Sequence, residues 1–336
     1  MRAPAFWRTR GLPARLLAPL GAIYGAVTAR RMRREGVRAE APVVCIGNFT
    51  AGGAGKTPTA LALADALAAQ GRRPAFLSRG YGGAIREPTR VDLNRHRADM
   101  TGDEPLLLAR RAPTVVSPDR VEGARLAAAL GDVVVMDDGL QNSSLAKDLR
   151  LAVVDGGFGV GNGLCLPAGP LRAPLETQLD AVDAVVVVGP GAPGAEVGRL
   201  AASRGLPVLQ ADIAPDSRTV AALRRGKVLA FAGIGRPEKM FETLRAAGVL
   251  VAEEMAFPDH HPFTRAEVAS LLARARRKGL RPVTTTKDWV RVSGLLAPGE
   301  EHDIVALPVT LEFRDPAALG RLLAERLRRP ALRPSA

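Results

Sequence analysis

Short apolar runs alternate with longer segments of helical periodicity along most of the chain. An apolar run bounded by turn residues predicts a buried strand, and a longer stretch closed by Gly predicts a helix. Strands are predicted at VVCIG (43–47), PAFLS (74–78), TVVS (114–117), DVVVMDD (132–138), LAVVD (151–155) and AVVVVG (184–189), and helices at 61–71, 104–112 and 121–131. This alternation predicts a doubly wound, mostly parallel α/β sheet with helices on both faces.

The pattern changes beyond Asp212. A polar stretch, APDSRT, precedes KVLAFAGIGRPEKMFETLRAAG at 227–248, which predicts a strand, a Gly/Pro turn and a helix. VTTTKDWVRV from Val283 and DIVALPV from Asp303 predict two more strands around the helix AEVASLLARARRKG. We therefore expect an N-terminal helix in 1–36, a larger α/β domain in 37–220 and a smaller α/β domain in 221–336.

The N-terminal apolar run, LLAPLGAIYGAVTA at 16–29, is flanked by basic residues. Its 14 residues are too few to cross a bilayer core of about 30 Å, which takes about 20 residues. The cluster Arg30, Arg31, Arg33 and Arg34 after it is unfavourable for a secretory signal. We interpret the segment as an interfacial helix with its apolar side in lipid and its Arg side on the headgroups, and a helix packed on its own domain is the alternative.

Charge and cysteine content narrow the possible partners. The formal net charge of +13 suits either nucleic acid or anionic headgroups and phosphorylated substrates, and a high-GC preference for Arg would also contribute to it. The aromatic content of 4% disfavours a single-strand nucleic-acid binder, which needs stacking platforms. Cys45 and Cys165 have neither metal-ligand spacing nor a disulfide pattern, which fits a reducing cytoplasm.

A glycine-rich stretch, TAGGAGKT, lies between the first predicted strand and the following helix. In such a loop successive backbone N–H groups face phosphates, the Lys reaches the β and γ oxygens, and the Thr hydroxyl binds Mg²⁺. The usual motif has Gly at its first position, so a Thr there makes this loop a variant. Its residues are Thr50, Ala51, Gly52, Gly53, Ala54, Gly55, Lys56 and Thr57.

A second candidate signal is DVVVMDDGLQN at 132–142, an apolar strand that ends in two carboxylates. P-loop enzymes place a carboxylate at the end of a neighbouring strand to hold Mg²⁺, which prefers oxygen ligands. Asp137 and Asp138 are therefore candidate magnesium-site residues together with Thr57. Taken alone, such a pair also suits a helix cap or a solvated turn.

Three further motifs carry polar groups that suit chemistry. In TGDEP, Asp103 is expected to cap a helix with Glu104 in its first turn. FPDHHPF at 257–263 suits a proton-transfer site or a plain polar turn. The Gly/Pro loop GNGLCLPAGPLRAPL at 161–175 contains one cation, Arg172, which is a candidate for binding phosphate, and a solvated loop Arg is the alternative.

These motifs occur in one order that resembles the tetraacyldisaccharide 4'-kinase family, which phosphorylates the lipid A disaccharide. The shared motifs run from about residue 43 to residue 291, which is most of the chain, and the N-terminal helix resembles that family's membrane-associating segment. They are TxGGxGKTP, SRGYGG at 78–83, GDEP, DDGLQ, GNGxxLPAGPLR, FAGIGxPxxxF at 231–241, FPDHHPF and TTKD at 285–288.

The resemblance implies an ATP- and Mg²⁺-dependent kinase acting on the lipid A disaccharide precursor at the cytoplasmic face of the bacterial inner membrane. It implies that Lys56 stabilises the transferred phosphoryl group and that Asp103 and His260 form a proton-accepting dyad. Gln141 and Arg172 are implied to be substrate-binding groups. A monomer bound to an anionic membrane surface, without nucleic acid, is expected. Family members often have His and Glu where this chain has Asn142 and Ala173.

Rival functions lack their defining residues or need an experiment. A membrane-targeted ATPase switch of the deviant-Walker type would have a signature Lys at position 51, which is Ala. A GTP-binding switch needs Asn-Lys-x-Asp, and no Asn in the chain is followed by Lys. A nucleic-acid binder would show steeply salt-dependent oligonucleotide binding.

Overall fold

The structure, a computed structural model, describes residues 4–300 and 302–327, which form two compact units. The larger unit contains Pro4–Asp212 and residues 311–327, and the smaller unit contains Ile213–Thr310. The expected boundary at residue 221 therefore lies eight residues late, and the chain after Thr310 returns to the larger unit. Residues 1–3, 301 and 328–336 of the expected ranges lie outside the described residues.

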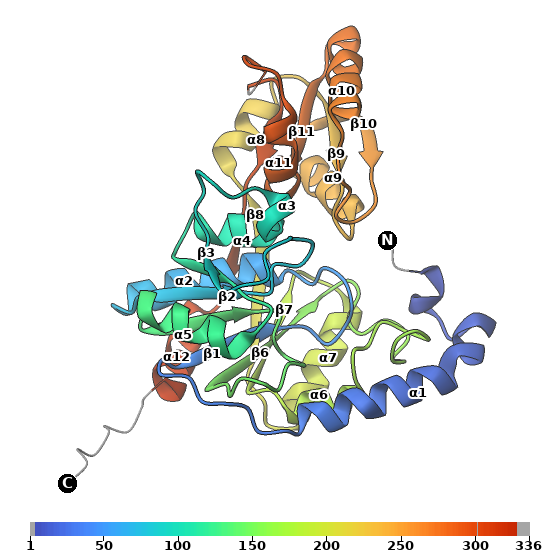
Figure 1. Ribbon diagram of the computed structural model, residues 1–336. Helices are drawn as coiled ribbons and strands as arrows, with labels where there is room; N and C mark the ends of the chain where they lie inside the picture. Colours follow the sequence, from blue (N-terminus) through green and yellow to red (C-terminus); the bar gives the residue numbers. More distant parts are fainter. Residues whose placement is uncertain (1–3, 301, 328–336) are drawn as a thin grey trace. The chain divides into compact units, whose positions relative to one another are not determined.

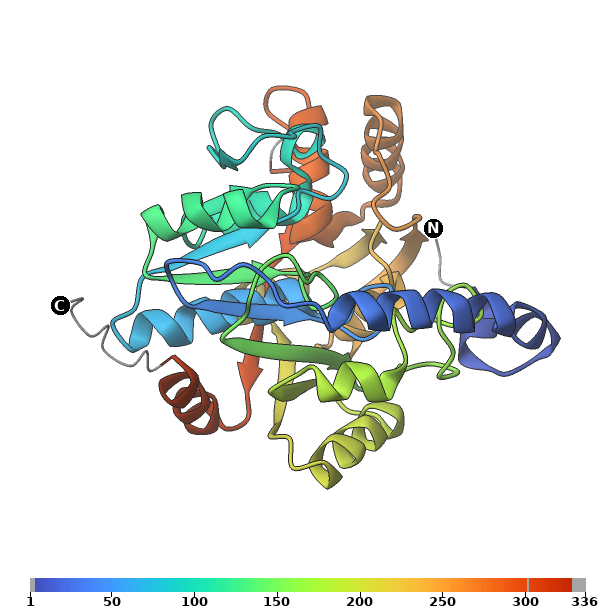
Figure 2. The ribbon, with the colours of Figure 1, turned by 60° about the horizontal axis from the view of Figure 1, so that its bottom comes forward.

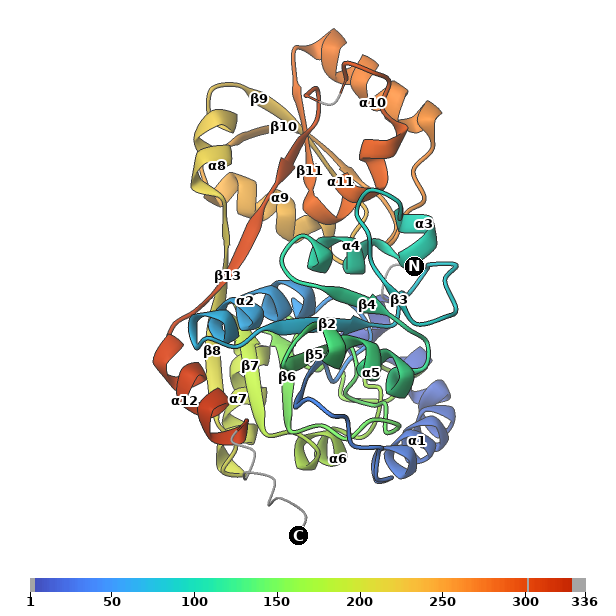
Figure 3. The ribbon, with the colours of Figure 1, turned by 60° about the vertical axis from the view of Figure 1, so that its left-hand side comes forward.

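The return to the larger unit has a clear physical cause. Strand β13 (Val309–Phe313) pairs with β8 (Val208–Pro215) at the edge of the larger unit's sheet, and Figure 3 shows the two strands side by side. Helix α12 (Pro316–Arg326) follows and buries Leu319, Leu322 and Leu323. The side chain of Gln70 donates to the carbonyl of Gly320 in this helix. The smaller unit is thus inserted between two paired strands of the larger one.

The larger unit has the predicted doubly wound sheet. Among the described residues its strand order is β13-β8-β7-β6-β1-β5-β2-β4-β3, and the pairs from β8 to β4 are parallel. The remaining strands are β1 (Val43–Gly47), β2 (Pro74–Ser78), β3 (Thr89–Arg90), β4 (Thr114–Val116), β5 (Val133–Asp137), β6 (Leu149–Asp155) and β7 (Ala184–Val188). Ile46 is in register with Asp137, so the carboxyl ends of β1 and β5 lie together.

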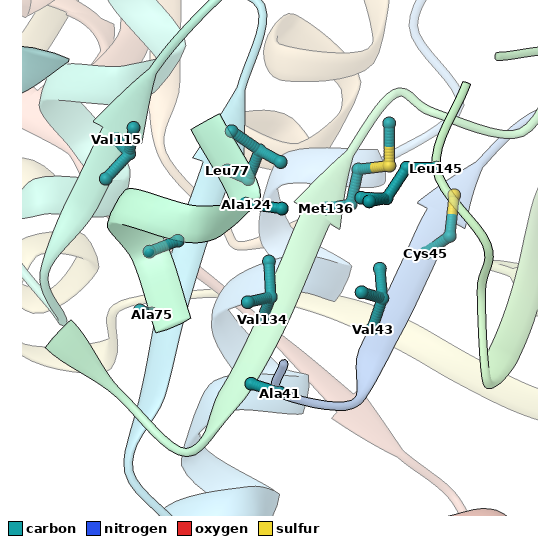
Figure 4. Packing of buried hydrophobic residues seen from close by; sticks show 11 residues of the cluster. Ala41, Val43, Cys45, Ala75, Leu77, Val115, Ala124, Val134, Met136 and Leu145 are labelled. Carbon is teal, nitrogen blue, oxygen red and sulfur yellow. The ribbon is translucent and has the colours of Figure 1, made fainter. Parts of the chain in front are cut away.

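Helices pack on both faces of this sheet (Figures 1 and 2). One face is covered by α5 (Arg120–Leu130), whose Ala124 and Ala127 pack against alternate residues of β1, β2 and β5. Figure 4 shows this cluster, with Val43 and Cys45 beside Val134 and Met136. The other helices are α2 (Lys56–Ala69), α3 (Ala98–Thr101), α4 (Asp103–Ala109), α6 (Leu175–Asp180) and α7 (Ala192–Ser203).

The smaller unit has a four-stranded sheet of order β10-β9-β11-β12 with parallel pairs throughout its described residues. Its elements are α8 (Ser217–Leu223), β9 (Lys227–Ala232), α9 (Pro237–Ala246), β10 (Leu250–Ala256), α10 (Arg265–Lys278), β11 (Arg281–Thr285), α11 (Thr286–Val292), η2 (Ser293–Leu295) and β12 (Val305–Leu307). The expected strand from Val283 ends at Thr285. There the hydroxyl of Thr285 accepts a hydrogen bond from the N–H of Asp288 and starts α11.

The N-terminal helix α1 (Leu12–Met32), preceded by η1 (Ala5–Arg8), is longer than the predicted apolar run. Among the described residues it is the one helix whose length and apolar composition would allow it to span a membrane. Its buried residues are small: Ala14, Gly21, Gly25 and Ala29. A Cβ on Gly21 would lie 2.7 Å from the carbonyl oxygen of Cys165, so the helix docks through glycine. Its large apolar side chains, Leu12, Leu16, Leu20, Ile23, Tyr24 and Val27, are exposed.

Candidate active site

The glycine-rich loop leaves the carboxyl end of β1 and leads into α2. Gly52 and Gly55 have φ of 110° and 95°, a region that glycine adopts without strain. Lys56 and Thr57 are the first two residues of α2, so the amino end of a 14-residue helix points into the loop. A Cβ on Gly52 or Gly53 would meet no atom of the described residues within 4 Å, so the loop is open on that side. Phosphate binding by this loop stays a prediction.

Lys56 extends toward the neighbouring strand. Its Nζ donates to Oδ1 of Asn48 at 3.4 Å and lies 3.8 Å from Oδ1 of Asp138. Asn48 is fully buried, and its Nδ2 donates to the carbonyl of Gly52 at 3.0 Å. Asn48 therefore contacts both the backbone of the loop at Gly52 and the side chain of Lys56 at the end of the loop. Sequence reasoning missed it, although a polar residue directly after a buried apolar strand is the available signal.

The loop that bears Arg172 pairs with the P-loop through its backbone. The N–H of Ala51 donates to the carbonyl of Pro170 at 2.7 Å, and the N–H of Arg172 donates to that of Phe49 at 2.9 Å. These bonds bring two distant segments, 49–51 and 170–172, to one position. Arg172 was predicted as a candidate from its motif, and the structure places it beside the P-loop.

Asp138 is the anionic centre of this cluster. Arg172 donates to both of its carboxylate oxygens, at 2.9 and 3.1 Å. Burial raises the pKa of Asp138, but the nearby cations Lys56 and Arg172 lower it by more than burial raises it. The pKa of Asp138 therefore lies below its ordinary value. Its φ of 52° is unusual for a residue with a side chain. Asp137 ends β5 and is almost fully buried.

Gln141 lies between Arg172 and the first residues of the P-loop. Its Oε1 accepts from Arg172 at 3.4 Å, and its Nε2 donates to the carbonyl of Asn48 at 2.9 Å and to Oε1 of Gln178 at 2.8 Å. The loop around Gln141 is held by Lys147, whose Nζ donates to the carbonyls of Leu140 and Asn142. Gln178 and Lys147 were not predicted from the sequence.

A buried cation, Arg120, adds to the positive charge near Asp138. It begins α5, is 4% exposed and donates to the carbonyl of Ser117 at 2.6 Å, and its Nε has no hydrogen-bond partner among the described residues. Burial lowers the pKa of its guanidinium, as does Arg79, whereas Asp138 opposes the shift. Sequence reasoning missed this residue because the helix start that carries it reads as an ordinary cap.

Asp103, the first member of the implied dyad, lies in the larger unit. It is the first residue of α4 rather than its cap, because Gly102 occupies the cap position with φ of 83°. The side chain is 4% exposed, and its Oδ1 accepts from the N–H of Glu104 at 2.9 Å. A Cβ on Gly102 would lie 2.5 Å from the carbonyl oxygen of Tyr81, so the SRGYGG loop packs directly against this helix start.

His260, the second member, lies in the smaller unit after β10. Its φ is 56°, and its N–H donates to the carbonyl of Gly233 at 3.0 Å. Nε2 of His260 lies 3.3 Å from Nζ of Lys287. The neighbouring His261 contacts Glu267 at 3.0 Å and stacks on Phe257, which gives it a structural role. The two dyad residues lie in different units, and the dyad stays a prediction.

No group of three or more His, Cys, Asp or Glu side chains suited to a metal occurs in the described residues. An ion bound mainly by phosphate oxygens would still find the hydroxyl of Thr57 and the carboxylates of Asp137 and Asp138 near the P-loop, and these hard oxygen donors suit Mg²⁺. Together with a lysine and an arginine at the carboxyl ends of the central strands β1 and β5, the loop defines a P-loop protein of the kinase class.

Comparison with known proteins assigns the family. The family model described as tetraacyldisaccharide-1-P 4'-kinase (LpxK) matches residues 13–328. The chain belongs to this family, as the resemblance of its motifs predicted.

Named relatives match over nearly the whole chain. The tetraacyldisaccharide 4'-kinase of Methylobacterium sp. (strain 4-46) is 57% identical over 96% of this chain and 96% of its own length. That of Rhodopseudomonas palustris (strain BisB5) is 53% identical over 97% of each. The crystal structure of LpxK from Aquifex aeolicus in complex with ATP superimposes with a TM-score of 0.73 at 25% identity, covering 94% of this chain and 99% of that one.

Proposed function

We propose that this protein transfers the γ-phosphoryl group of ATP to the 4'-hydroxyl of tetraacyldisaccharide 1-phosphate, a step of lipid A biosynthesis. The observation that carries the proposal is the cluster at the P-loop, in which Lys56 and Arg172 face Asp138 within 3.8 Å. Phosphoryl transfer demands chiefly alignment and neutralisation of charge on the migrating group. A lysine and an arginine fixed beside a phosphate-binding loop supply both.

In the proposed reaction the 4'-oxygen bonds to the γ-phosphorus while the bond from that phosphorus to the β–γ bridging oxygen breaks, and ADP leaves. Backbone N–H groups of the P-loop hold the β-phosphate, and Lys56 stabilises the negative charge on the γ-phosphoryl group during transfer. Thr57 with Asp137 or Asp138 would hold Mg²⁺, and the ion would supply neutralisation of the phosphate charge. Asp137 suits this role because it pairs with Ile46 at the end of β1, from which the P-loop leaves. Asp138 is instead hydrogen-bonded to Arg172.

The hydroxyl proton needs an acceptor, and we assign it to the dyad of Asp103 and His260. The ammonium of Lys287 can only donate hydrogen bonds, so Nε2 of His260 accepts one from it, and the substrate hydroxyl would have to replace Lys287 as the donor at this nitrogen. Such a nitrogen is suited to take a proton. Coupled effects of His260→Ala and Asp103→Ala on turnover would support the dyad, and fully additive effects would contradict it.

Membrane contact is assigned to α1. Its exposed apolar side chains and the arginines at its end suit the boundary between acyl chains and anionic headgroups on the cytoplasmic side of the inner membrane. The protein would act there as a monomer, either lying on the membrane or anchored by this helix. Binding to anionic vesicles that Leu16→Asp and Ile23→Asp abolish together, with turnover on detergent-dispersed substrate retained, is the expected result.

The decisive experiment measures transfer of radiolabelled γ-phosphate to a detergent-dispersed tetraacylated glucosamine disaccharide 1-phosphate. Lys56→Ala and a reaction without Mg²⁺ are the controls. Label on the lipid that disappears in both controls is expected. If ATP is hydrolysed and no lipid is labelled, the proposal is wrong and a membrane-targeted ATPase switch becomes the better assignment.

A further inference from the structure

Gln178 is a fully buried polar residue in α6, beside Gln141 and the backbone of Phe49 and Ala173. Its Nε2 donates to the carbonyls of Phe49 at 3.1 Å and Ala173 at 2.7 Å. Both partners can only accept, so the nitrogen of this amide must face them. The oxygen of Gln178 is therefore forced to the opposite side, where it accepts from Gln141 at 2.8 Å.

The orientation of Gln141 follows from that of Gln178. The nitrogen of Gln141 has two acceptors, the oxygen of Gln178 and the carbonyl of Asn48. Its own oxygen is left to face the guanidinium of Arg172 at 3.4 Å. A reversed Gln141 amide would place N–H donors against a cation that has no acceptor. The carbonyls of Phe49 and Ala173 thus fix the amide of Gln178, and Gln178 fixes the amide of Gln141 so that its oxygen faces Arg172.

We propose that Gln178 is a positioning residue for phosphoryl transfer, which acts by turning the oxygen of Gln141 toward Arg172. The proposal rests on the proposed function for its kinetic consequence. Nη1 of Arg172 then donates to both Asp138 and Gln141, and the carbonyls of Asn48 and Phe49 connect the two glutamines to the segment that leads into the P-loop. Arg172 is kept at the place where the γ-phosphoryl group passes.

Position 173, next to Arg172, has no polar side chain that could orient Gln141 or Arg172. Ala173 is fully buried, and its side chain has no polar group. The carbonyl of Ala173 is instead used as one of the two acceptors that orient Gln178. The polar group near this part of the site is therefore supplied from α6, five positions further along the chain.

The first test is spectroscopic and independent of activity. The chain contains four glutamines, Gln70, Gln141, Gln178 and Gln210, so selective ¹⁵N-glutamine labelling of the full-length protein gives four side-chain amide pairs. The side-chain amide protons of Gln141 and Gln178 are expected to exchange slowly with solvent. Gln178→Met should remove one pair and shift the Gln141 pair while leaving those of Gln70 and Gln210 in place. An unchanged Gln141 signal would overturn the relay.

The second test is kinetic, with lipid phosphorylation by the wild type as the reference. Gln178→Met should lower kcat about 10- to 100-fold, as losses of residues that orient an active-site group do, and should leave the KM for ATP within about threefold. Gln141→Met combined with Gln178→Met should be no slower than the slower single variant, because both act through one contact. Additive losses, or a kcat equal to that of wild type, would contradict the proposal. Gln210→Met, on an exposed position of β8, is the matched control.

Gln178→Glu separates orientation from packing, because it keeps the shape of the side chain. Its carboxylate would face two carbonyl oxygens, and only the protonated form can donate to one of them. Burial raises the pKa of such a carboxyl, so the turnover of this variant relative to wild type should rise as the pH falls from 8 to 6. A pH-independent ratio would count against the relay. If the wild type labels no lipid at all, the proposed function fails, and the spectroscopic result alone decides the relay.

Discussion

Replacing Gly47 by Ala is expected to move the P-loop away from the DDGLQ segment. Gly47 is the last residue of β1, and Leu140 lies between Asp138 and Gln141. A Cβ at position 47 would lie 2.5 Å from Cβ of Leu140 and 3.1 Å from its backbone nitrogen. Neither atom is the end of a flexible side chain, so the backbone itself has to shift.

The size of the effect follows from these distances. Carbon atoms in contact lie about 3.5–4.0 Å apart, so the two segments must separate by about 1 Å. Overpacking of this kind costs about 1–3 kcal/mol of stability. A misplacement of about 1 Å can reduce turnover about 100-fold, and here it would lengthen the 3.8 Å approach of Lys56 to Asp138. We therefore expect a large loss of kcat with a moderate loss of stability.

The assay combines lipid phosphorylation with urea unfolding. Gly226→Ala is the control, because a Cβ there meets no described atom within 4 Å and the residue does not have a positive φ. The control should keep wild-type turnover. If Gly47→Ala turns over within about twofold of wild type and unfolds at the same urea concentration, then the close contact does not fix the geometry of the site, and the reasoning is refuted.

Three further perturbations test other parts of the structure. Met136→Ala removes a fully buried side chain from the cluster in Figure 4 and should cost about 2–5 kcal/mol in urea unfolding. The pKa of Asp138 is lower in the folded than in the unfolded protein, so its carboxylate stabilises the fold above the unfolded pKa of about 3.9, and this stabilisation is lost as the pH falls through the folded pKa. The free energy of unfolding of Asp138→Asn should therefore change less between about pH 7 and 3 than that of wild type. Gly25→Leu places a Cβ 2.8 Å from Sγ of Cys165 and should displace α1, which would raise the rate at which a thiol reagent modifies Cys165; an unchanged rate would show that the helix accommodates the larger residue.

The central strands could be predicted because they are buried on both faces, which makes them continuous apolar runs. The edge pair of β8 and β13 could not, because its residues are partly exposed and its partners lie far apart in sequence. Likewise, the helix from Thr286 depends on a single hydroxyl of Thr285, which the apolar pattern around it conceals.

The candidate site shows a similar division. Lys56, Asp138, Gln141 and Arg172 belong to recognisable motifs, and the structure brings them together. Asn48 and Lys147 bind backbone carbonyls only four to seven residues away but belong to none of the recognised motifs, whereas Gln178 binds the carbonyl of Phe49, 129 residues away, which no local spacing encodes. A glutamine in a short helix reads as an ordinary surface residue until the fold buries it.

The insertion of the smaller unit between β8 and β13 has a consequence for synthesis on the ribosome. The larger unit exposes the edge of β8 until β13 emerges, roughly a hundred residues later, which at about 5–20 residues per second takes about 5–20 s. An unpaired strand edge is a template for association with other chains. Rapid folding of the inserted unit would shorten the distance between the two strand ends and favour closure of the sheet by its own last strand.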